Sequence, residues 1–303
     1  MPLNPPIRHP GPAAARRDAR AHARTRPIAF TIEEGETVEE GLGRGLRASG
    51  CDSAYIEFDG GRLSPFAFVM PAAAPDDRHA AWYSPTVQHD AGGRVLFAGA
   101  IVGWRDGETF VHCHGSWQAK GGPVEMGHLL CPDSRAAAPI EVRGTGLHGA
   151  AFISQDDPET CFRLFAAQAA AAGAGNDNSE TGSDEAGDAR DPDGLAVTLR
   201  PNQDVCAALA AICRDEGFAR AEIRGIGSLN GAIFEEGPAM RSYASEFVVL
   251  EGCYDAAADP EAARLRILVV DMDGRVFEGW LAPGECPVCV TCEFVVTAAN
   301  SAT

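Results

Sequence analysis

Two stretches of the chain repeat the same order of hydrophobic and polar positions. Residues 28–38 alternate as a strand does and then reach the polar residues of a helix start, and residues 195–205 follow the same pattern. Ile28 corresponds to Leu195 at an offset of 167 positions, and the same offset aligns Gly50 with Gly217, where both helices are expected to end. The pattern predicts a strand, a helix and a second strand in each copy.

A second register appears nearer the ends of the copies. There the offset is 152, which aligns Gly127 with Gly279 and Glu141 with Glu293. The first copy is therefore 15 residues longer, and we expect the additional residues around 65–95, as a loop or added strands. Two consistent registers predict a tandem duplication of an α+β module, with domains at residues 28–153 and 195–303.

The segments outside the two copies differ from them in composition. Residues 1–27 hold six arginines and one aspartate among many prolines and alanines, which predicts a flexible basic arm. The Asp-Pro-Glu sequence at 157–159 precedes an alanine-rich run, which predicts a helix over 154–172. Gly, Asn, Ser and acidic residues fill positions 173–194, a composition typical of a flexible acidic linker.

Composition narrows the classes of function. The 303 residues carry 43 acidic and 25 basic side chains, a formal charge of -18, so the body of the protein repels a phosphate backbone. Nucleic acid is thus an unfavoured partner. No apolar run reaches the roughly 20 residues needed to cross a membrane, and the start of the chain does not resemble a secretory signal. We expect a cytoplasmic protein whose ten cysteines are reduced thiols.

Three histidines form the strongest chemical motif. Residues two apart in a strand share a face, so His112 and His114 are expected side by side while Cys113 points away. The Gly121-Gly122 turn would fold the chain back and bring His128 opposite the pair. Three imidazoles with an open fourth position are typical of a catalytic metal site.

The second copy serves as an internal comparison for this motif. At the offset of 152 it carries Arg264, Arg266 and Trp280 in place of the three histidines. A requirement of folding alone would have kept similar residues in both copies. We therefore expect one divalent metal per chain, with zinc as the first candidate, although three imidazoles also suit iron, nickel and copper.

Other polar groups are weaker candidates. Glu141 is the catalytic candidate. If it faces His128, it could orient the ring or accept a proton from metal-bound water. Its recurrence as Glu293 in the second copy also fits a shared structural role. Glu125 is a lesser candidate on the turn. A CxxCxxC sequence resembles part of a cluster-binding run, but ordinary thiols are favoured there over a cluster or zinc site: Cys286, Cys289 and Cys292. Three other histidines are expected at loop or surface positions: His79, His89 and His148.

These motifs resemble a known family. The HCH and GHL motifs of the first copy, with the Glu-Val strand end, and residues 200–231 and 250–252 of the second copy resemble the PPC domain (plant and prokaryote conserved, DUF296). The resemblance implies an α+β fold with a largely antiparallel sheet, trimers among single-domain relatives and a histidine-bound metal in some of them. It also implies the family's DNA-binding label, which comes from relatives that carry an AT-hook. Residues 22–27 do not contain the Gly-Arg-Pro core of that motif.

Two functions of different classes remain open. The first is a metal-centred small-molecule site in the first domain, with metal-assisted hydrolysis or hydration as the simplest chemistry, since a bound metal lowers the pKa of water to about 7. The second is an oligomerisation or regulatory module without catalysis. Whether the chain is an enzyme and what its ligand is stay open, and we expect a homo-oligomer, a trimer first, with the histidine site near a domain or subunit boundary.

Overall fold

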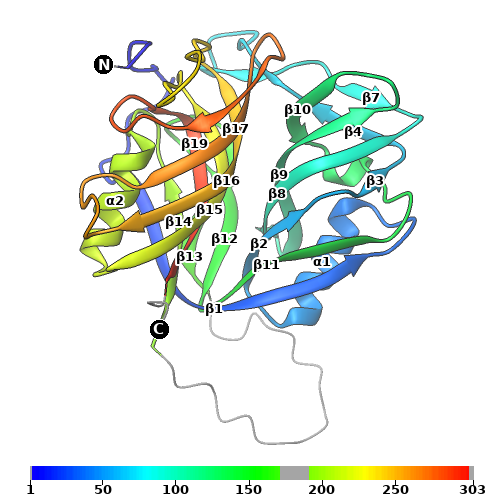
Figure 1. Cartoon of the computed structure of the whole chain (residues 1–303), viewed down its shortest axis with the longest axis horizontal. Helices are drawn as coiled ribbons and strands as arrows, with labels where there is room; N and C mark the ends of the chain where they lie inside the picture. The colour runs from blue at the N-terminus through cyan, green and yellow to red at the C-terminus, as the bar shows by residue number, and fades with distance from the viewer. Residues whose placement is uncertain (1, 171–190, 300–303) are drawn as a thin grey trace, which may run out of the picture.

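The computed structural model describes residues 2–170 and 191–299, which form two halves joined by one long strand (Figure 1). The first half contains β1 (Asp18–Ile32), α1 (Val38–Ser49), β2 (Ser53–Phe58), β3 (Arg62–Leu63), β4 (Phe66–Val69), β5 (Pro71–Ala72), β6 (Trp82–Tyr83), β7 (Val87–His89), β8 (Gly93–Arg105), β9 (Glu108–Ala119), β10 (Val124–Leu129), a 3-10 turn (Cys131–Asp133), β11 (Ile140–His148), β12 (Ala150–Asp156) and β13 (Arg163–Ala169). The second half contains β14 (Gly194–Leu199), α2 (Val205–Asp215), β15 (Arg220–Leu229), β16 (Ser245–Asp255), β17 (Arg264–Asp271), β18 (Val276–Trp280) and β19 (Val288–Ala298).

Local sequence accounts for both helices. Thr37 accepts a hydrogen bond from the backbone of Glu40, whose side chain bonds back to Thr37, and Gly50 ends α1 with a φ of 69°. Asp204 caps α2 by accepting from the backbone N–H of Ala207. The helices therefore begin and end where the sequence predicts.

Each half is a largely antiparallel sheet. In the first half the order is β1-β11-β2-β8-β9-β10-β4-β7, and in the second it is β14-β19-β15-β16-β17-β18. Residues 18–23 of β1 pair with β14, and residues 24–32 pair with β11, so a single strand belongs to both sheets. The fold is α+β, as the pattern of the sequence indicates.

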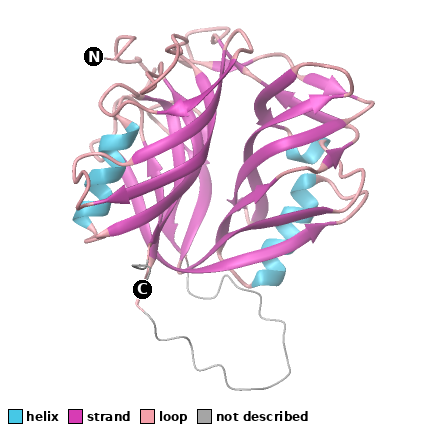
Figure 2. Ribbon diagram, in the orientation of Figure 1, coloured by secondary structure: helices cyan, strands magenta, loops and turns pink. Residues whose placement is uncertain are grey.

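The two sheets pack face to face, with one helix on the outer side of each (Figure 2). One apolar cluster lies between α1 and its sheet, and a second between α2 and its sheet. A third cluster, which includes Tyr55, Ile101, Phe152, Val248 and Val295, fills the space between the sheets. Burial of both faces of each sheet holds the halves together. A side chain at the centre of the inner face of either sheet therefore lies between the two domains.

The elements of the two halves recur at the offsets read from the sequence. The starts of α1 and α2 lie 167 positions apart, as do those of β2 and β15, while β8 and β16, β9 and β17 and β10 and β18 correspond at or near 152. The additional residues of the first half form β3 to β7 and their turns. The predicted position of the insertion, around residues 65–95, coincides with these short strands.

The helix predicted over 154–172 is wrong. Residues 157–162 form a turn, with Cys161 at a φ of 63°, and β13 then pairs with β12 along its whole length. Phe165 and Ala167 alternate into the apolar layer between the sheets. Pairing with β12 and burial of this face outweigh the high helix propensity of the alanines, because tertiary contacts override propensity.

The flexible arm predicted for residues 1–27 is also wrong. From Asp18 the chain is strand β1, residues 4–9 lie against the second half, and Ala14 and Arg17 contact Glu159 in the turn between β12 and β13. The imidazole of His9 is hydrogen bonded to the carbonyl of Cys289 at 2.8 Å, and Arg17 is bound to Glu159. Arg17 and Arg20 of the predicted basic arm form ion pairs with acidic side chains, so these charges are compensated within the fold.

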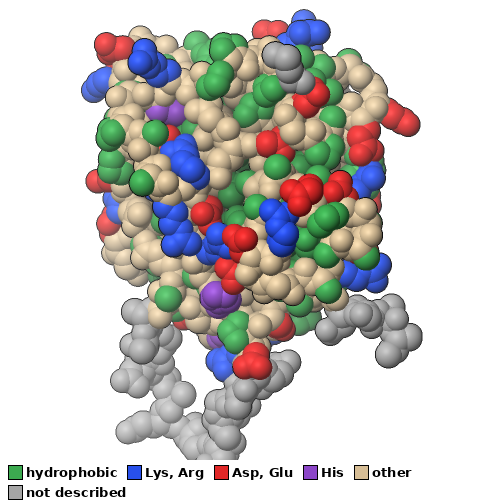
Figure 3. All heavy atoms as spheres, turned by 90° about the vertical axis from the view of Figure 1, so that its left-hand side faces the viewer, with side chains coloured by type: hydrophobic (Ala, Val, Ile, Leu, Met, Phe, Trp, Pro, Cys, Tyr) green, Lys and Arg blue, Asp and Glu red, His purple; other side chains and the backbone are tan. Residues whose placement is uncertain are grey.

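Residues 173–190 of the predicted linker 173–194 lie outside the described residues, while Asp193 accepts from Thr25 and Gly194 begins β14. Among the described residues, no helix is long and apolar enough to span a membrane. Acidic and basic side chains are interspersed on the face shown in Figure 3, without a single large basic patch.

Candidate metal centre between the two domains

The three histidines of the sequence motif meet on the inner face of the first sheet. His112 and His114 share a face of β9, Cys113 points into the core behind, and His128 on β10 is paired directly with His114. One possible ligand atom from each ring lies within 4.8 Å of the other two. The strand parity and the hairpin turn inferred from the sequence thus bring these rings together.

The second domain contacts two of these rings. Glu293 on β19 lies 3.0 Å from Nδ1 of His112, and the backbone carbonyl of Phe247 on β16 lies 2.9 Å from Nδ1 of His114. A carbonyl and an ionised carboxylate only accept hydrogen bonds, so both Nδ1 atoms donate. The Nε2 atoms of both rings are left with lone pairs, 3.0 Å apart.

Burial keeps two of the rings, those of His114 and His128, unprotonated. Desolvation lowers the pKa of His114 and of His128 well below the usual range, and the neighbouring His112 lowers both further. His114 is 2% exposed, and Nδ1 of His128 is buried without a hydrogen-bond partner in the described structure. Neutral imidazoles with free lone pairs are the form that binds a metal.

A second carboxyl group, that of Glu246, also faces the rings. Its Oε2 lies 3.8 Å from Nε2 of His114 and makes no hydrogen bond in the described structure. Desolvation raises the pKa of this carboxyl well above its usual range. Glu246 is not among the site residues predicted from the sequence, although a lone acid before the apolar run Phe247–Leu250 is a recognisable signal of a buried functional group.

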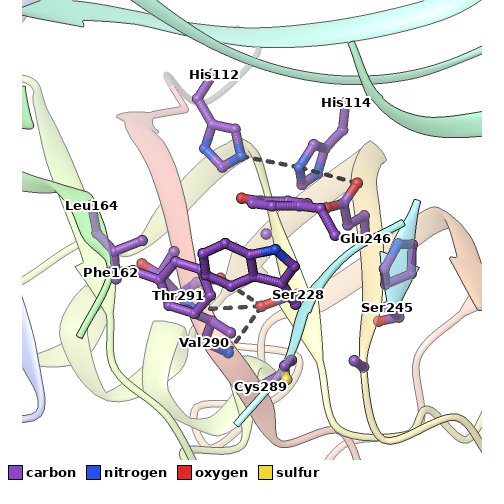
Figure 4. A pocket seen from close by; sticks show the side chains of 16 residues that line it. His112, His114, Phe162, Leu164, Ser228, Ser245, Glu246, Cys289, Val290 and Thr291 are labelled. Atoms are coloured by element: carbon purple, nitrogen blue, oxygen red, sulfur yellow. Dashed lines mark hydrogen bonds and ion pairs between the residues drawn. The ribbon is translucent and has the colours of Figure 1, made fainter. Parts of the chain in front are cut away.

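His112 and His114 line a small pocket between the domains, which we call the interdomain pocket (Figure 4). It has a volume of about 60 Å³, and Figure 4 shows Glu246 beside His112 and His114. Its other walls are mostly apolar and aromatic, and no lysine or arginine lines it among the described residues. Residues from both domains line it, among them Trp82, Tyr83, Phe162, Ser228 and Thr291.

The other candidates lie away from this centre. Glu141 is exposed and accepts a hydrogen bond from Thr31, so its expected position facing His128 is wrong. Its counterpart Glu293 does reach the site, because that part of β19 is covered by the other sheet. Glu125 lies beside His89 at 2.8 Å.

The CxxCxxC sequence does not form a metal-binding group among the described residues. Cys286, Cys289 and Cys292 are buried free thiols, and the Sγ atoms of Cys286 and Cys292 donate to backbone carbonyls. Desolvation raises the pKa of Cys286 and of Cys289 to about 12. These thiols are part of the apolar clusters of the second half.

The counterparts of the histidines in the second domain form a different structure. Arg266 is paired with Trp280 in the strand register, as His114 is with His128. Its guanidinium makes ion pairs with Glu251 and Glu278, and Arg264 lies over the ring of Trp280. In this domain, the positions that carry histidines in the first domain are therefore occupied by residues that form ion pairs and a cation–π contact.

Comparison with known proteins finds a family match in the second half of the chain. Residues 189–300 match the family model of the Plants and Prokaryotes Conserved (PCC) domain. No curated protein matches the chain. Three solved structures are similar to about half of it. A metal-containing protein of Archaeoglobus fulgidus is 19% identical over 46% of this chain and 92% of that chain, with a TM-score of 0.38. A plant- and prokaryote-conserved protein of Pyrococcus horikoshii is 20% identical over 48% of this chain and 93% of that chain (TM-score 0.39), and a candidate DNA-binding protein of Ralstonia eutropha is 14% identical over 45% of this chain and 88% of that chain (TM-score 0.33).

Proposed function

We propose that this chain, whose residues 189–300 are a PCC domain, is a metal-binding protein that holds a single divalent ion between its two halves. His112, His114 and His128 of the first half are the proposed ligands, and the second half supplies the groups that orient them. The interdomain pocket is the proposed binding site for a small molecule.

One observation carries this proposal: the Nε2 atoms of His112 and His114 face each other at 3.0 Å while both Nδ1 atoms have acceptors as partners. Two lone pairs at this distance repel unless a proton or a cation lies between them. A proton would serve one pair of nitrogens. A metal ion serves all three rings, and the buried Nδ1 of His128 has no other partner in the described structure.

The donor set fits a catalytic type of metal site. Three imidazoles are a common ligand set of zinc, and a position left open beside them is where water or a substrate binds. Such an ion would supply a Lewis acid and a nucleophilic water near neutral pH, which supports hydrolysis or hydration of a small molecule. Within the chain, Glu293 and the Phe247 carbonyl hold the tautomer of two ligands, and Glu246 lies where it can hold or accept a proton.

Elemental analysis of protein purified without a histidine tag tests the proposal. We expect one equivalent of a divalent metal per chain, because the described structure contains one such group of ligands. Two equivalents would contradict the assignment of the second domain as lacking a site. A protein that contains no metal and binds none on addition of Zn²⁺ would overturn the proposal.

A substitution of Glu293 tests the contribution of the second domain. Glu293→Gln keeps the size of the side chain but replaces the charged acceptor at Nδ1 of His112, and we expect metal affinity to fall about 10- to 100-fold. Competition with a chelator of known affinity measures the change. Glu141→Gln, at the equivalent exposed position of the first domain, is the matched control and should leave affinity unchanged.

The correspondence of elements at two offsets supports a tandem duplication in which one copy kept the ligands. We also propose a homo-oligomer, a trimer first, as the resemblance implies. Within one chain the second domain already covers the histidines, so the metal centre itself does not require a neighbouring subunit. Light scattering decides the oligomeric state, and a mass near the 31.8 kDa of one chain would discard the trimer.

A further inference from the structure

A second pocket lies in the first domain, away from the three histidines and with none of the same lining residues. It has a volume of about 410 Å³, and we call it the thiol pocket because Cys51 is part of its wall. Asp52, Trp104 and Gln168 line it as well, together with Ala169 of β13. Such a volume is within the range of small-molecule sites.

The thiol in this wall has a base beside it. Sγ of Cys51 lies 3.6 Å from Nε2 of His148, which stands at the end of β11. Burial lowers the pKa of His148, and Arg26 lowers it further, so the ring is neutral near pH 7 and Nε2 can accept the thiol proton. A cysteine and a neutral histidine within hydrogen-bond reach are the two partners of an activated nucleophile.

The backbone holds this pair in a fixed position. Cys51 follows the end of α1 and its N–H donates to Oγ of Ser49. Trp104 donates to the carbonyl of Asp52, whose carboxylate accepts from the N–H of Gly149, next to His148. A side chain on Gly146 would meet Sγ of Cys51 at 2.4 Å, so this glycine leaves the space that the thiol occupies.

Cys51 is buried in the core cluster of the first domain, but comparison of the two domains shows that packing at this position does not require a thiol. At the offset of 167, the position of Cys51 corresponds to Phe218, which packs against the core of the second domain. The same corner of the fold therefore forms around an aromatic ring. The thiol, its histidine partner and the open pocket occur together in the first domain.

We propose that Cys51 is a nucleophilic thiol, with His148 as its base, and that the thiol pocket admits small disulfides that are neutral or positively charged. The charge preference follows from Asp52, because the other acid of the lining, Asp106, is paired with Arg163, and no lysine or arginine among the described residues lines the pocket itself. The indole of Trp104 provides an apolar wall.

The reaction is a thiol–disulfide exchange. His148 takes the proton from Sγ of Cys51, and the thiolate attacks one sulfur of the disulfide. A new S–S bond joins Cys51 to half of the molecule while the original S–S bond breaks. The departing thiolate takes the proton back from His148. Cys51 is oxidised and the leaving half of the disulfide is reduced.

Two small disulfides of opposite charge test the proposal on the full chain. Cystamine is cationic and dithiodiglycolate is anionic, and peptide mass spectrometry measures the rate of mixed-disulfide formation at each cysteine. Cys161 and Cys253 are exposed and serve as internal references. We expect cystamine to modify Cys51 at least as fast as these references, and about tenfold faster than dithiodiglycolate does. Slower modification of Cys51 than of both references would overturn the proposal.

Variants separate the base from the pocket. His148→Gln should slow the reaction of Cys51 about tenfold or more and leave the rates at Cys161 and Cys253 unchanged. Ala169→Phe, at an exposed position of the pocket wall, should block cystamine but still allow the smaller iodoacetamide to react. If His148→Gln leaves the rate unchanged in protein with an unaltered circular dichroism spectrum, His148 is not the base. Metal content should be the same in all variants, which keeps this test independent of the metal proposal.

Discussion

Replacement of any one of His112, His114 or His128 by alanine is expected to remove the metal ion from the protein. Each substitution leaves two imidazoles, and a three-histidine site loses its chelating geometry when one ligand is lost. Elemental analysis of each purified variant should show less than a tenth of the wild-type metal content. The far-UV circular dichroism spectrum should be unchanged, because the sheet is held by clusters on both of its faces.

Arg266→Ala is the matched control for His114→Ala. It removes a side chain at the equivalent position of the second domain, where the guanidinium makes ion pairs on the exposed surface. Metal content should stay at the wild-type level. Loss of metal from this variant, or full metal content in all three histidine variants, would contradict the assignment of the ligands.

Bound metal should also stabilise the wild-type protein. A ligand that binds the folded state alone adds about 2.7 kcal/mol when its concentration is 100 times the dissociation constant. Addition of Zn²⁺ to metal-free protein should therefore raise the midpoint of thermal unfolding in the wild type. No comparable increase is expected in the three histidine variants.

Arg17→Ala is expected to lower the free energy of unfolding by about 2 to 3 kcal/mol, because it leaves a buried carboxylate without its main partner. Two nitrogens of Arg17 bind both oxygens of Glu159, at 2.7 and 2.9 Å, and the Glu159 side chain is 4% exposed. This pair fastens the N-terminal segment to the turn between β12 and β13. Urea unfolding at pH 7 measures the loss.

The effect should depend on pH in a defined direction. Burial raises the pKa of Glu159, but the hydrogen bonds of Arg17 and of the Ala14 N–H outweigh it, so the pKa in the folded protein lies below its usual value. A lowered carboxyl pKa contributes stability above the unfolded pKa, and this contribution is lost as the pH falls through the folded pKa. The difference between wild type and Arg17→Ala should therefore shrink below about pH 4.

A neighbouring arginine provides the control for this prediction. Arg16 is 68% exposed and lies 3.7 Å from Asp18, so Arg16→Ala should change stability by less than about 0.5 kcal/mol. Equal losses of unfolding free energy in the two variants would mean that the positive charge of the segment stabilises the protein, and not the buried ion pair. An unchanged stability of Arg17→Ala would show that the N-terminal segment does not contribute to the fold.

Local patterns in the sequence determined the ends of the helices, the face that the histidines share and the correspondence between the two halves. Thr37 and Gly50 mark the ends of α1 because capping depends on a few adjacent residues. The alternation of side chains along a strand placed His112 and His114 on one face, and the hairpin turn placed His128 across from them. The two offsets anticipated which strands of the halves correspond, since each copy repeats its own local pattern.

Tertiary structure decided what depends on contacts between distant residues. The alanine-rich segment became β13 because β12 offers it backbone partners and an apolar layer to fill, which no local pattern shows. Glu246 and Glu293 reach the histidines because the second sheet packs against the first, more than 100 residues away in the chain. The pairing of Cys51 with His148 likewise required β11 to lie beside the end of α1. Periodicity reports which face of an element a residue occupies, whereas the partner of that face is set by packing.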